Sequence, residues 1–336
     1  MIITNNVSTR SHNTFGIDAS FDTLIQIDSD EDFYYLDQWK DSEIKILGGG
    51  SNVLLTDDIH IPVFNINNKG FRILKDAEGY VLVNIAAGEI WHDAVLWAVN
   101  NGYGGIENLS LIPGKCGAAP IQNIGAYGVE IKDILHTVKA YDREQGVVKF
   151  FYNQECAFGY RSSNFKTIWK GQYVITDIIL QLTKPNHHII NTSYGAISGE
   201  LEKRGISNPN IKDISDVVIN IRASKLPNPK VIGNAGSFFK NPIIDKETFE
   251  KLQTAYPNIP NYPAGEDIKL AAGWLIDQCG WKGRVVGNTG TYKHQALVIV
   301  NHGDASGTEV KAVAQSIQKD VLEKFKINIE PEVNIW

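Results

Sequence analysis

Glycine is concentrated in two segments of this chain. The conformation that so many glycines allow the backbone to adopt is the strongest constraint on the fold. The first is LGGGSN, residues 47–52, directly before the aliphatic run VLL. The second is SLIPGKCGAAPIQNIGAYGVEI, residues 110–131, which is rich in Gly and Ala and poor in charge. Consecutive glycines can gather backbone N–H groups into a concave nest that binds an anion, or they can form a flexible turn. The second segment is consistent either with a flat ligand lying against its backbone or with a tightly packed loop. Taken alone, each segment can therefore be a binding site or a purely structural feature.

The familiar phosphate-binding motifs are absent. The pattern GxxxxGK[ST] fails because Cys116 follows Gly114 and Lys115, and GxGxxG fails because Val53 stands where the last glycine belongs. Both motifs also require a helix that begins at the glycine-rich turn, and none is predicted after residue 52. A P-loop and a Rossmann dinucleotide site are therefore excluded.

Composition limits the class of protein. The chain has 336 residues, 43% hydrophobic and 21% charged, which is typical of a globular protein of one or two domains. The net charge of −6 argues against general binding of nucleic acid or of an anionic membrane. No apolar run reaches the roughly 18 residues of a membrane span, and we expect no secretory leader. Three cysteines without a CxxC pair favour a reducing cytoplasm and predict no metal site.

Helices and strands are predicted in both halves without regular alternation, which indicates the α+β class. An apolar stripe at helical spacing predicts a helix from Trp91 to about Gly102. A second helix is expected within 266–283, ending near Gly280. A third begins at Ser306, whose SGTE sequence matches a capping box. The last ten residues, INIEPEVNIW, are predicted to form a strand.

Six segments together carry a family resemblance. They are NTFGIDA (13–19), LGGGSN (47–52), IPGKCGAAPIQNIGAYG (112–128), FGYRSSNFK (158–166), GNAGSFFKNP (233–242) and EPEVNI (330–335). In this order they resemble the UDP-N-acetylenolpyruvoylglucosamine reductases. The resemblance implies an α+β fold with an FAD-binding domain of the p-cresol-methylhydroxylase (PCMH, vanillyl-alcohol-oxidase-like) type at 1–205. It further implies a smaller α+β substrate-binding domain at 206–326 and a final strand, 327–336, that returns toward the active site.

The resemblance also implies the chemistry. A bound FAD would be reduced by NADPH and would then pass hydride to UDP-N-acetylglucosamine enolpyruvate, giving UDP-N-acetylmuramate for peptidoglycan. The expected protein is a cytoplasmic monomer that uses small-molecule partners and neither binds nucleic acid nor inserts into a membrane. The cofactor residues implied are Gly48, Gly49, Gly50, Ser51, Asn52, Pro113, Gly114, Gly117, Ala118, Gln122, Asn123, Gly125 and Tyr127.

Three residues are expected to be catalytic. A fixed guanidinium at Arg161 would pair with the substrate carboxylate as negative charge develops there, a contribution of roughly 3–4 kcal/mol in comparable sites. Ser237 would donate the proton. Glu332 would help only if its carboxyl were neutral or hydrogen-bonded. From the residues alone, the alternatives are a surface arginine, a turn serine and a solvated charge.

Six further residues match substrate contacts of the family: Tyr194, Arg222, Lys225, Asn241, Tyr262 and Gln295. Arg222 and Lys225 would neutralise a diphosphate, although two basic residues this close together are also ordinary surface charge. Tyr194 and Tyr262 match a subclass whose extra loop covers the substrate, or they are simply packed aromatics. Lys115 and Cys116 depart from the family pattern and receive no role.

Two rival functions stay open at this point. A flavin oxidase of the same fold would keep both glycine-rich segments but would have no reason to keep Arg161, Ser237 and Glu332 together. A module that binds a nucleotide sugar or a flavin without catalysis would bind ligand and never turn it over.

Overall fold

The computed structural model describes residues 1–336, and the chain forms two compact units. Unit 1 comprises residues 1–7, 21–49 and 60–224, and unit 2 comprises residues 8–20, 50–59 and 225–336. The functional domain limits predicted from the sequence stay a prediction, because a compact unit is not by itself a binding domain. No helix of the chain combines the length and the apolar character that crossing a membrane requires.

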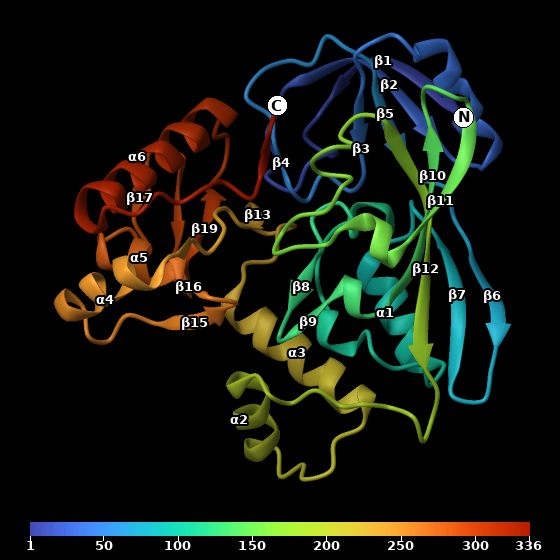
Figure 1. Ribbon diagram of the computed structural model, residues 1–336. Helices are drawn as coiled ribbons and strands as arrows, with labels where there is room; N and C mark the ends of the chain where they lie inside the picture. The colour runs from blue at the N-terminus through green and yellow to red at the C-terminus, as the bar shows by residue number, and fades with distance from the viewer. The chain divides into compact units, whose positions relative to one another are not determined.

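Unit 1 holds two sheets, a hairpin and three α-helices (Figure 1). Its strands are β1 (Ile2–Ser8), β2 (Ser20–Ile27), β3 (Lys45–Leu47), β5 (Val63–Ile66), β6 (Phe71–Asp76), β7 (Tyr80–Ala86), β8 (Gly125–Ala126), β9 (Val129–Glu130), β10 (Leu135–Asp142), β11 (Val147–Tyr152) and β12 (Tyr173–Thr183). Its helices are α1 (Trp91–Asn100), α2 (Gly195–Lys203) and α3 (Ile211–Lys225), with short 3-10 turns η1 (Glu31–Trp39), η2 (Glu107–Leu109), η3 (Cys116–Ala118), η4 (Ile131–Asp133) and η5 (Asn153–Cys156).

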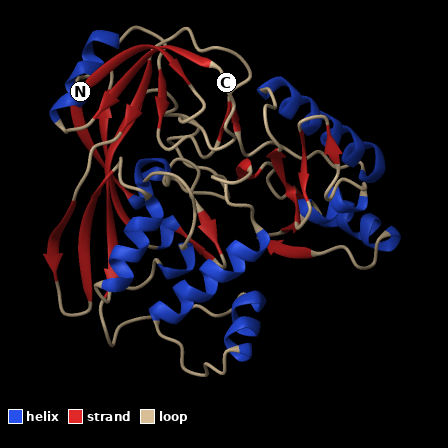
Figure 2. Cartoon of the chain, turned by 180° about the vertical axis from the view of Figure 1, so that it is seen from behind, coloured by secondary structure: helices blue, strands red, loops and turns tan.

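The larger sheet of unit 1 is antiparallel and has the order β11-β10-β12-β7-β6. Figure 2 shows its long strands side by side from behind. The smaller sheet has the order β1-β2-β5-β3, and β5 runs parallel to both β2 and β3. Strand β12 is central and almost entirely buried, which explains its nearly continuous apolar sequence YVITDIILQLT.

Helix α1 confirms the helix predicted from the apolar stripe. Its five stripe residues are all buried in the core of unit 1: Trp91, Ala94, Val95, Ala98 and Val99. The helix ends before Gly102, which adopts a left-handed φ of 73°. Helices α2 and α3 share a separate apolar cluster.

Unit 2 is built from short strands and three helices. Its strands are β4 (Val53–Leu54), β13 (Gly233–Ser237), β14 (Ile243–Ile244), β15 (Asn261–Ala264), β16 (Asp267–Leu270), β17 (Val285–Val286), β18 (Thr289–Tyr292), β19 (Gln295–Asn301) and β20 (Asn334–Ile335). Its helices are α4 (Lys246–Ala255), α5 (Ala272–Gln278) and α6 (Gly307–Phe325). An antiparallel sheet of order β13-β19-β18-β17 packs against α5 and α6. Because neither unit alternates strand and helix regularly, the predicted α+β class is confirmed.

The capping box predicted at Ser306 is present. The Ser306 hydroxyl accepts a hydrogen bond from the backbone N–H of Glu309, and the Glu309 carboxylate accepts one from the backbone N–H of Ser306. The helix predicted within 266–283 is wrong in its first part, because Asp267–Leu270 pairs with β14 and β15 as a strand and the helix begins only at Ala272. The predicted final strand is reduced to β20, which pairs in parallel with β4.

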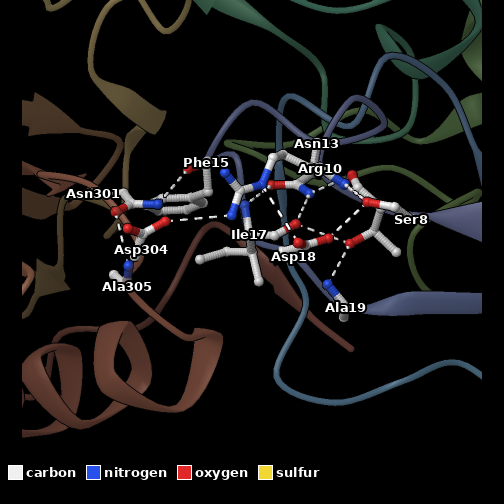
Figure 3. A network of polar contacts seen from close by, with 11 residues as sticks. Ser8, Arg10, Asn13, Phe15, Ile17, Asp18, Ala19, Asn301, Asp304 and Ala305 are labelled. Carbon is white, nitrogen blue, oxygen red and sulfur yellow. Dashed lines mark hydrogen bonds and ion pairs between the residues drawn. The ribbon is translucent and has the colours of Figure 1, made fainter.

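Residues 8–20 form a strap that belongs to unit 2 although it lies near the start of the chain. Figure 3 shows how polar groups fix it: Asn301 donates through Nδ2 to the carbonyl of Phe15 at 2.9 Å, and Arg10 Nη2 lies 3.4 Å from Asp304 Oδ1. Within the strap, the side chain of Asn13 donates to the carbonyls of Thr9 and Ile17. The segment NTFGIDA is thus a structural part of unit 2.

Candidate functional site

The two glycine-rich segments meet inside unit 1. A Cβ atom built on Gly48 would lie 3.8 Å from the Cβ atoms of both Ala118 and Lys115. One built on Gly49 would lie 3.4 Å from the Cα atom of Gly114. Segments about 65 positions apart in the sequence therefore lie against each other. Gly49 itself is exposed, so its backbone is accessible to solvent.

The three consecutive glycines have different reasons to be glycine. Gly50, in unit 2, has a φ of +61°, and a Cβ there would stand 2.0 Å from the carbonyl oxygen of His12. Only glycine fits at that position, whatever binds nearby. Gly48, in unit 1, has no left-handed φ, and an added Cβ would make only ordinary contacts. Nothing inside unit 1 therefore requires glycine at Gly48.

Gly117 and Gly125 of the second segment are required because their neighbours leave no room for a side chain. A Cβ on Gly117 would stand 2.5 Å from the Cβ of Ala87, and one on Gly125 would stand 2.8 Å from Cγ of Glu130. The loop is therefore tightly packed, and it places the backbone of Gly114 and the side-chain stem of Lys115 beside Gly49. Of the other predicted cofactor residues, Pro113 and Ala118 are exposed, and Ser51, Gln122 and Tyr127 are half-buried.

Asn123 is a brace within this loop. Its side chain is fully buried, and Nδ2 donates to Glu130 Oε2 and to the carbonyl of Gly159, each at 3.0 Å. Its Oδ1 accepts a hydrogen bond from the backbone N–H of Lys132. These bonds hold Asn123 at a left-handed φ of 46° and connect the second glycine-rich segment to the turn that carries Arg161.

Arg161 projects from that turn against the same loop. Its backbone is left-handed, with a φ of 53°, and its side chain is half-buried. Nη2 donates to the carbonyl of Gly125 at 3.0 Å, and Nη1 lies 3.5 Å from the carbonyl of Asn123. Unusual backbone geometry held by its surroundings is common at functional sites, and here it fixes a guanidinium at the edge of the loop.

A second guanidinium comes from α3. Arg222 donates through Nε to the carbonyl of Leu111 at 3.2 Å and shares a side-chain hydrogen bond with Tyr127. Burial lowers the pKa of Arg222, Tyr127 opposes that shift, and the nearby charge of Arg161 lowers the pKa further. The positive charges of these two neighbouring arginines add up, which favours the binding of an anionic ligand between or beside them.

His92 is a part of this site that the sequence does not indicate. Its Nδ1 accepts a hydrogen bond from the backbone N–H of Leu111 at 2.9 Å, so this nitrogen carries no proton. Leu111 has a left-handed φ of 57° and is thus held from both sides, by His92 at its N–H and by Arg222 at its carbonyl. Burial lowers the pKa of His92, which favours the neutral ring that this contact requires.

Tyr194 lies next to the loop. Its ring meets that of Tyr127 edge to face, with centroids 5.1 Å apart. The buried amide of Asn108 donates to the carbonyls of Tyr127 and Asn191, at 3.2 and 3.0 Å. The segment that carries Tyr194 is thereby tied to the loop, and 44% of the Tyr194 surface is exposed.

In unit 2 the structure brings Ser237, Glu332 and Asn52 to one place. Ser237 ends β13 after a bulge at Gly236, whose φ is 69°, and it is exposed. The next residue, Phe238, accepts the backbone N–H of Glu332 at 2.7 Å. The Glu332 carbonyl in turn accepts from Nδ2 of Asn52 at 3.2 Å.

The remaining predicted residues fall into two groups. Asn241 and Gln295 both lie at the start of α5: Oδ1 of Asn241 accepts the N–H of Ala272 at 3.0 Å, and Oε1 of Gln295 lies 3.0 Å from where a Cβ on Gly273 would be. Tyr262 on β15 and Lys225 at the end of α3 are exposed, and they are not packed into this group.

The residues fit a flavin dinucleotide, because the backbone around Gly48 and Gly49, without side chains, would offer amide donors to a diphosphate. Residues 38–152 match the family described as FAD binding domain, and residues 227–336 match the family described as UDP-N-acetylenolpyruvoylglucosamine reductase, C-terminal domain. Fold and loop thus define an FAD-binding oxidoreductase.

The UDP-N-acetylenolpyruvoylglucosamine reductase of Flavobacterium johnsoniae is 50% identical over 337 residues, which cover 100% of both chains. That of Pseudomonas aeruginosa is 44% identical and covers 98% of this chain and 97% of the relative. The chain belongs to the UDP-N-acetylenolpyruvoylglucosamine reductase family.

Two solved structures share the fold. The UDP-N-acetylenolpyruvylglucosamine reductase of Thermus caldophilus aligns with a TM-score of 0.69 at 22% identity over 100% of both chains. The 6-hydroxy-D-nicotine oxidase of Arthrobacter nicotinovorans aligns with a TM-score of 0.54 at 12% identity, over 97% of this chain and 86% of the oxidase. The predicted PCMH-type α+β fold is confirmed.

Proposed function

We propose that this protein reduces UDP-N-acetylglucosamine enolpyruvate to UDP-N-acetylmuramate with NADPH, in the synthesis of peptidoglycan precursors. The family and the FAD-binding domain support this reaction. The observation that carries it is the pair Arg161 and Arg222, two guanidinium groups fixed beside the loop that contains Gly125 and Leu111. An enolpyruvyl nucleotide sugar offers both a carboxylate and a diphosphate for such groups to bind.

The reaction needs a hydride carrier, and FAD supplies it when bound, because no side chain can carry hydride. Arg161 binds the substrate carboxylate and stabilises the negative charge that develops on it. The guanidinium is held by the carbonyls of Gly125 and Asn123, so little reorganisation is required when the charge appears. Arg222 remains protonated at neutral pH despite its lowered pKa and adds positive charge to the same region.

Protonation of the substrate carbon falls to unit 2. Ser237 donates its hydroxyl proton to the carbon that carries the developing charge, and it recovers a proton from solvent because it is exposed. Glu332 assists from the segment whose backbone pairs with Phe238. Lys225, Asn241 and Gln295 contact the nucleotide-sugar part of the substrate, and Tyr194 and Tyr262 cover it; the exposure of both tyrosines supports that role.

We also propose the compartment, the oligomeric state and the domain limits of the enzyme. The odd number of separated cysteines, all free, suits the reducing cytoplasm, where peptidoglycan precursors are made. We propose that the protein works there as a monomer whose partners are its small-molecule substrates. Its FAD-binding and substrate-binding domains are proposed to span 1–205 and 206–326, with the final strand 327–336 returning to the active site.

One experiment tests the whole reaction. The purified protein should be yellow, and NADPH without oxygen should bleach it. Adding the enolpyruvyl substrate should restore the colour, with UDP-N-acetylmuramate formed in equal amount. Colour that returns only with oxygen would support a flavin oxidase instead, and colour that NADPH never bleaches would support a module that binds without turnover.

A further inference from the structure

Lys115 has no role in the proposed reaction, although it lies in the second glycine-rich segment. Its side chain is half-buried, and Nζ donates to the carbonyl of Ile66 at 2.6 Å. It also lies 3.5 Å from Oδ1 of Asn65 and 3.4 Å from Oδ1 of Asn67. All three partners are carbonyl oxygens, so the hydrogen bonds hold the ammonium in place without neutralising its charge.

The lysine is connected to the first glycine-rich segment in two ways. Asn65, which it contacts, donates through Nδ2 to the carbonyl of Gly48 at 2.9 Å and to that of Leu47 at 3.3 Å. The aliphatic stem of Lys115 packs against the glycines themselves, since a Cβ on Gly49 would lie 3.7 Å from its Cγ. The ammonium of Lys115, the side-chain amide of Asn65 and the carbonyl of Gly48 are therefore connected by a chain of hydrogen bonds.

The charges around Lys115 do not compensate it. Lys69 lies near enough to repel it, while the ammonium of Lys69 is itself 3.6 Å from Glu89. Asp28 attracts it more weakly and already pairs with the amino terminus and accepts from Gln26. Burial, followed by the charge of Lys69, lowers the pKa of Lys115 to about 8. A partly buried charge without a counterion is costly, and a bound anion would offset that cost.

We propose that Lys115 and Asn65 are positioning residues for the FAD diphosphate. Asn65 fixes the carbonyl of Gly48, so that the backbone amides of the loop stay directed at the cofactor. Lys115 holds Asn65 and supplies the positive charge that the diphosphate requires. The inference rests on FAD binding, and it assigns a function to a position that the family resemblance leaves without one.

The test is the affinity of the apoprotein for FAD, measured by flavin fluorescence at about pH 7 and about pH 9.5. Because the diphosphate would stabilise the charged amine, binding should take up a proton in this range, and the dissociation constant of the wild-type protein should rise about tenfold. Lys115→Met should bind FAD about tenfold more weakly at the lower pH and should lose most of the pH dependence. Lys115→Arg should bind FAD about as tightly as the wild-type protein at the lower pH, and its dissociation constant should change little at the higher pH because arginine stays charged.

Two further variants separate positioning from general charge. Lys69→Met removes a neighbouring positive charge that does not contact Asn65, and it should change the affinity by less than about threefold. Asn65→Leu should weaken FAD binding, and its effect should not add to that of Lys115→Met, because the two residues share one contact. Thermal unfolding of each apoprotein checks that the fold is kept.

The proposal is overturned if Lys115→Met binds FAD as tightly as the wild-type protein with the same pH profile. Should that variant fail to fold, a wild-type dissociation constant that stays constant from about pH 7 to about pH 9.5 overturns it equally. Failure of the FAD assignment would look different, since no variant would then bind FAD at either pH.

Discussion

Arg161 in unit 1 and Ser237 in unit 2 are held in opposite ways. Arg161 has a left-handed backbone, a half-buried side chain and two loop carbonyls under its guanidinium. Ser237 is exposed, and what is fixed around it is backbone, through the bulge at Gly236 and the pairing of Phe238 with Glu332. A group that stabilises charge gains from a rigid position, whereas a group that gives up a proton in every cycle must also be able to recover one.

The largest effect is expected for Ser237→Ala. The rate at which substrate restores the flavin colour should fall about 10²- to 10⁴-fold, the usual contribution of a positioned acid. Bleaching by NADPH should stay within about twofold, because it needs no proton from Ser237. Stopped-flow absorbance measures both rates, with Ser316→Ala, an exposed serine of the same unit, as the control. Equal losses in both rates would refute the proton-donor role.

Arg161→Lys should lower the rate of colour restoration about 10²- to 10³-fold. A lysine keeps the charge but cannot reproduce the planar fork that binds a carboxylate with two hydrogen bonds. The matched control is Arg204→Lys at the residue that follows α2, where the arginine pairs with Glu200. If lysine serves as well as arginine at position 161, the rigid geometry described for unit 1 has no catalytic value.

The glycines on either side of the unit boundary offer a sharper comparison. Gly50→Ala should lower the free energy of unfolding by about 2–4 kcal/mol, because the left-handed backbone and the carbonyl of His12 both exclude a side chain. Gly48→Ala should leave that free energy within about 0.5 kcal/mol and weaken FAD binding instead. Urea unfolding of the apoproteins and FAD titration test this pair. Identical behaviour of the two variants would contradict the division of roles.

The smallest effect concerns His92 and acid. Burial lowers its pKa from the ordinary value of 6.5, so the unfolded chain takes up a proton before the folded one does. The contribution of neutral His92 is complete above pH 6.5 and is lost as the pH falls through the lower folded value. The groups that act on it are Asp93, which raises its pKa, and Arg222, which lowers it.

His92→Asn is the informative variant, because its amide oxygen can accept from Leu111 near the position of Nδ1 and does not titrate. The free energy of unfolding should therefore depend less on pH between about pH 7 and pH 5 in this variant than in the wild-type protein. His92→Phe removes the acceptor and should destabilise the loop at every pH. An unchanged pH slope in His92→Asn would show that this contact does not matter.

Local patterns predicted local structure well. The helical stripe from Trp91 and the capping box at Ser306 are both present, because each depends on residues a few positions apart. The helix expected within 266–283 begins late, since pairing with two other strands outweighs the helix propensity of Asp267–Leu270. The glycine-rich segments were recognised, but the separate reasons for Gly48 and Gly50 depend on distant atoms.

The contacts that support the site could not be predicted from the sequence, even where one of the residues was. His92 contacts Leu111 across 19 positions, and Arg222 contacts the same residue across 111. Asn65 and Lys115 meet across 50 positions. Such pairs are fixed by the folded backbone, and neither spacing nor composition indicates them.

The strap of residues 8–20 has a consequence for synthesis in the cell. Its anchor Asn301 lies 286 positions after Phe15, so at roughly 5–20 residues per second the ribosome needs about 15–60 s to deliver it. Until then Phe15, which is buried in the folded protein, lacks part of its cover, which Phe238 and Asn301 supply. Unit 2 can fold completely only after translation is almost finished, and a chain that stopped before Asn301 would leave the strap without this anchor.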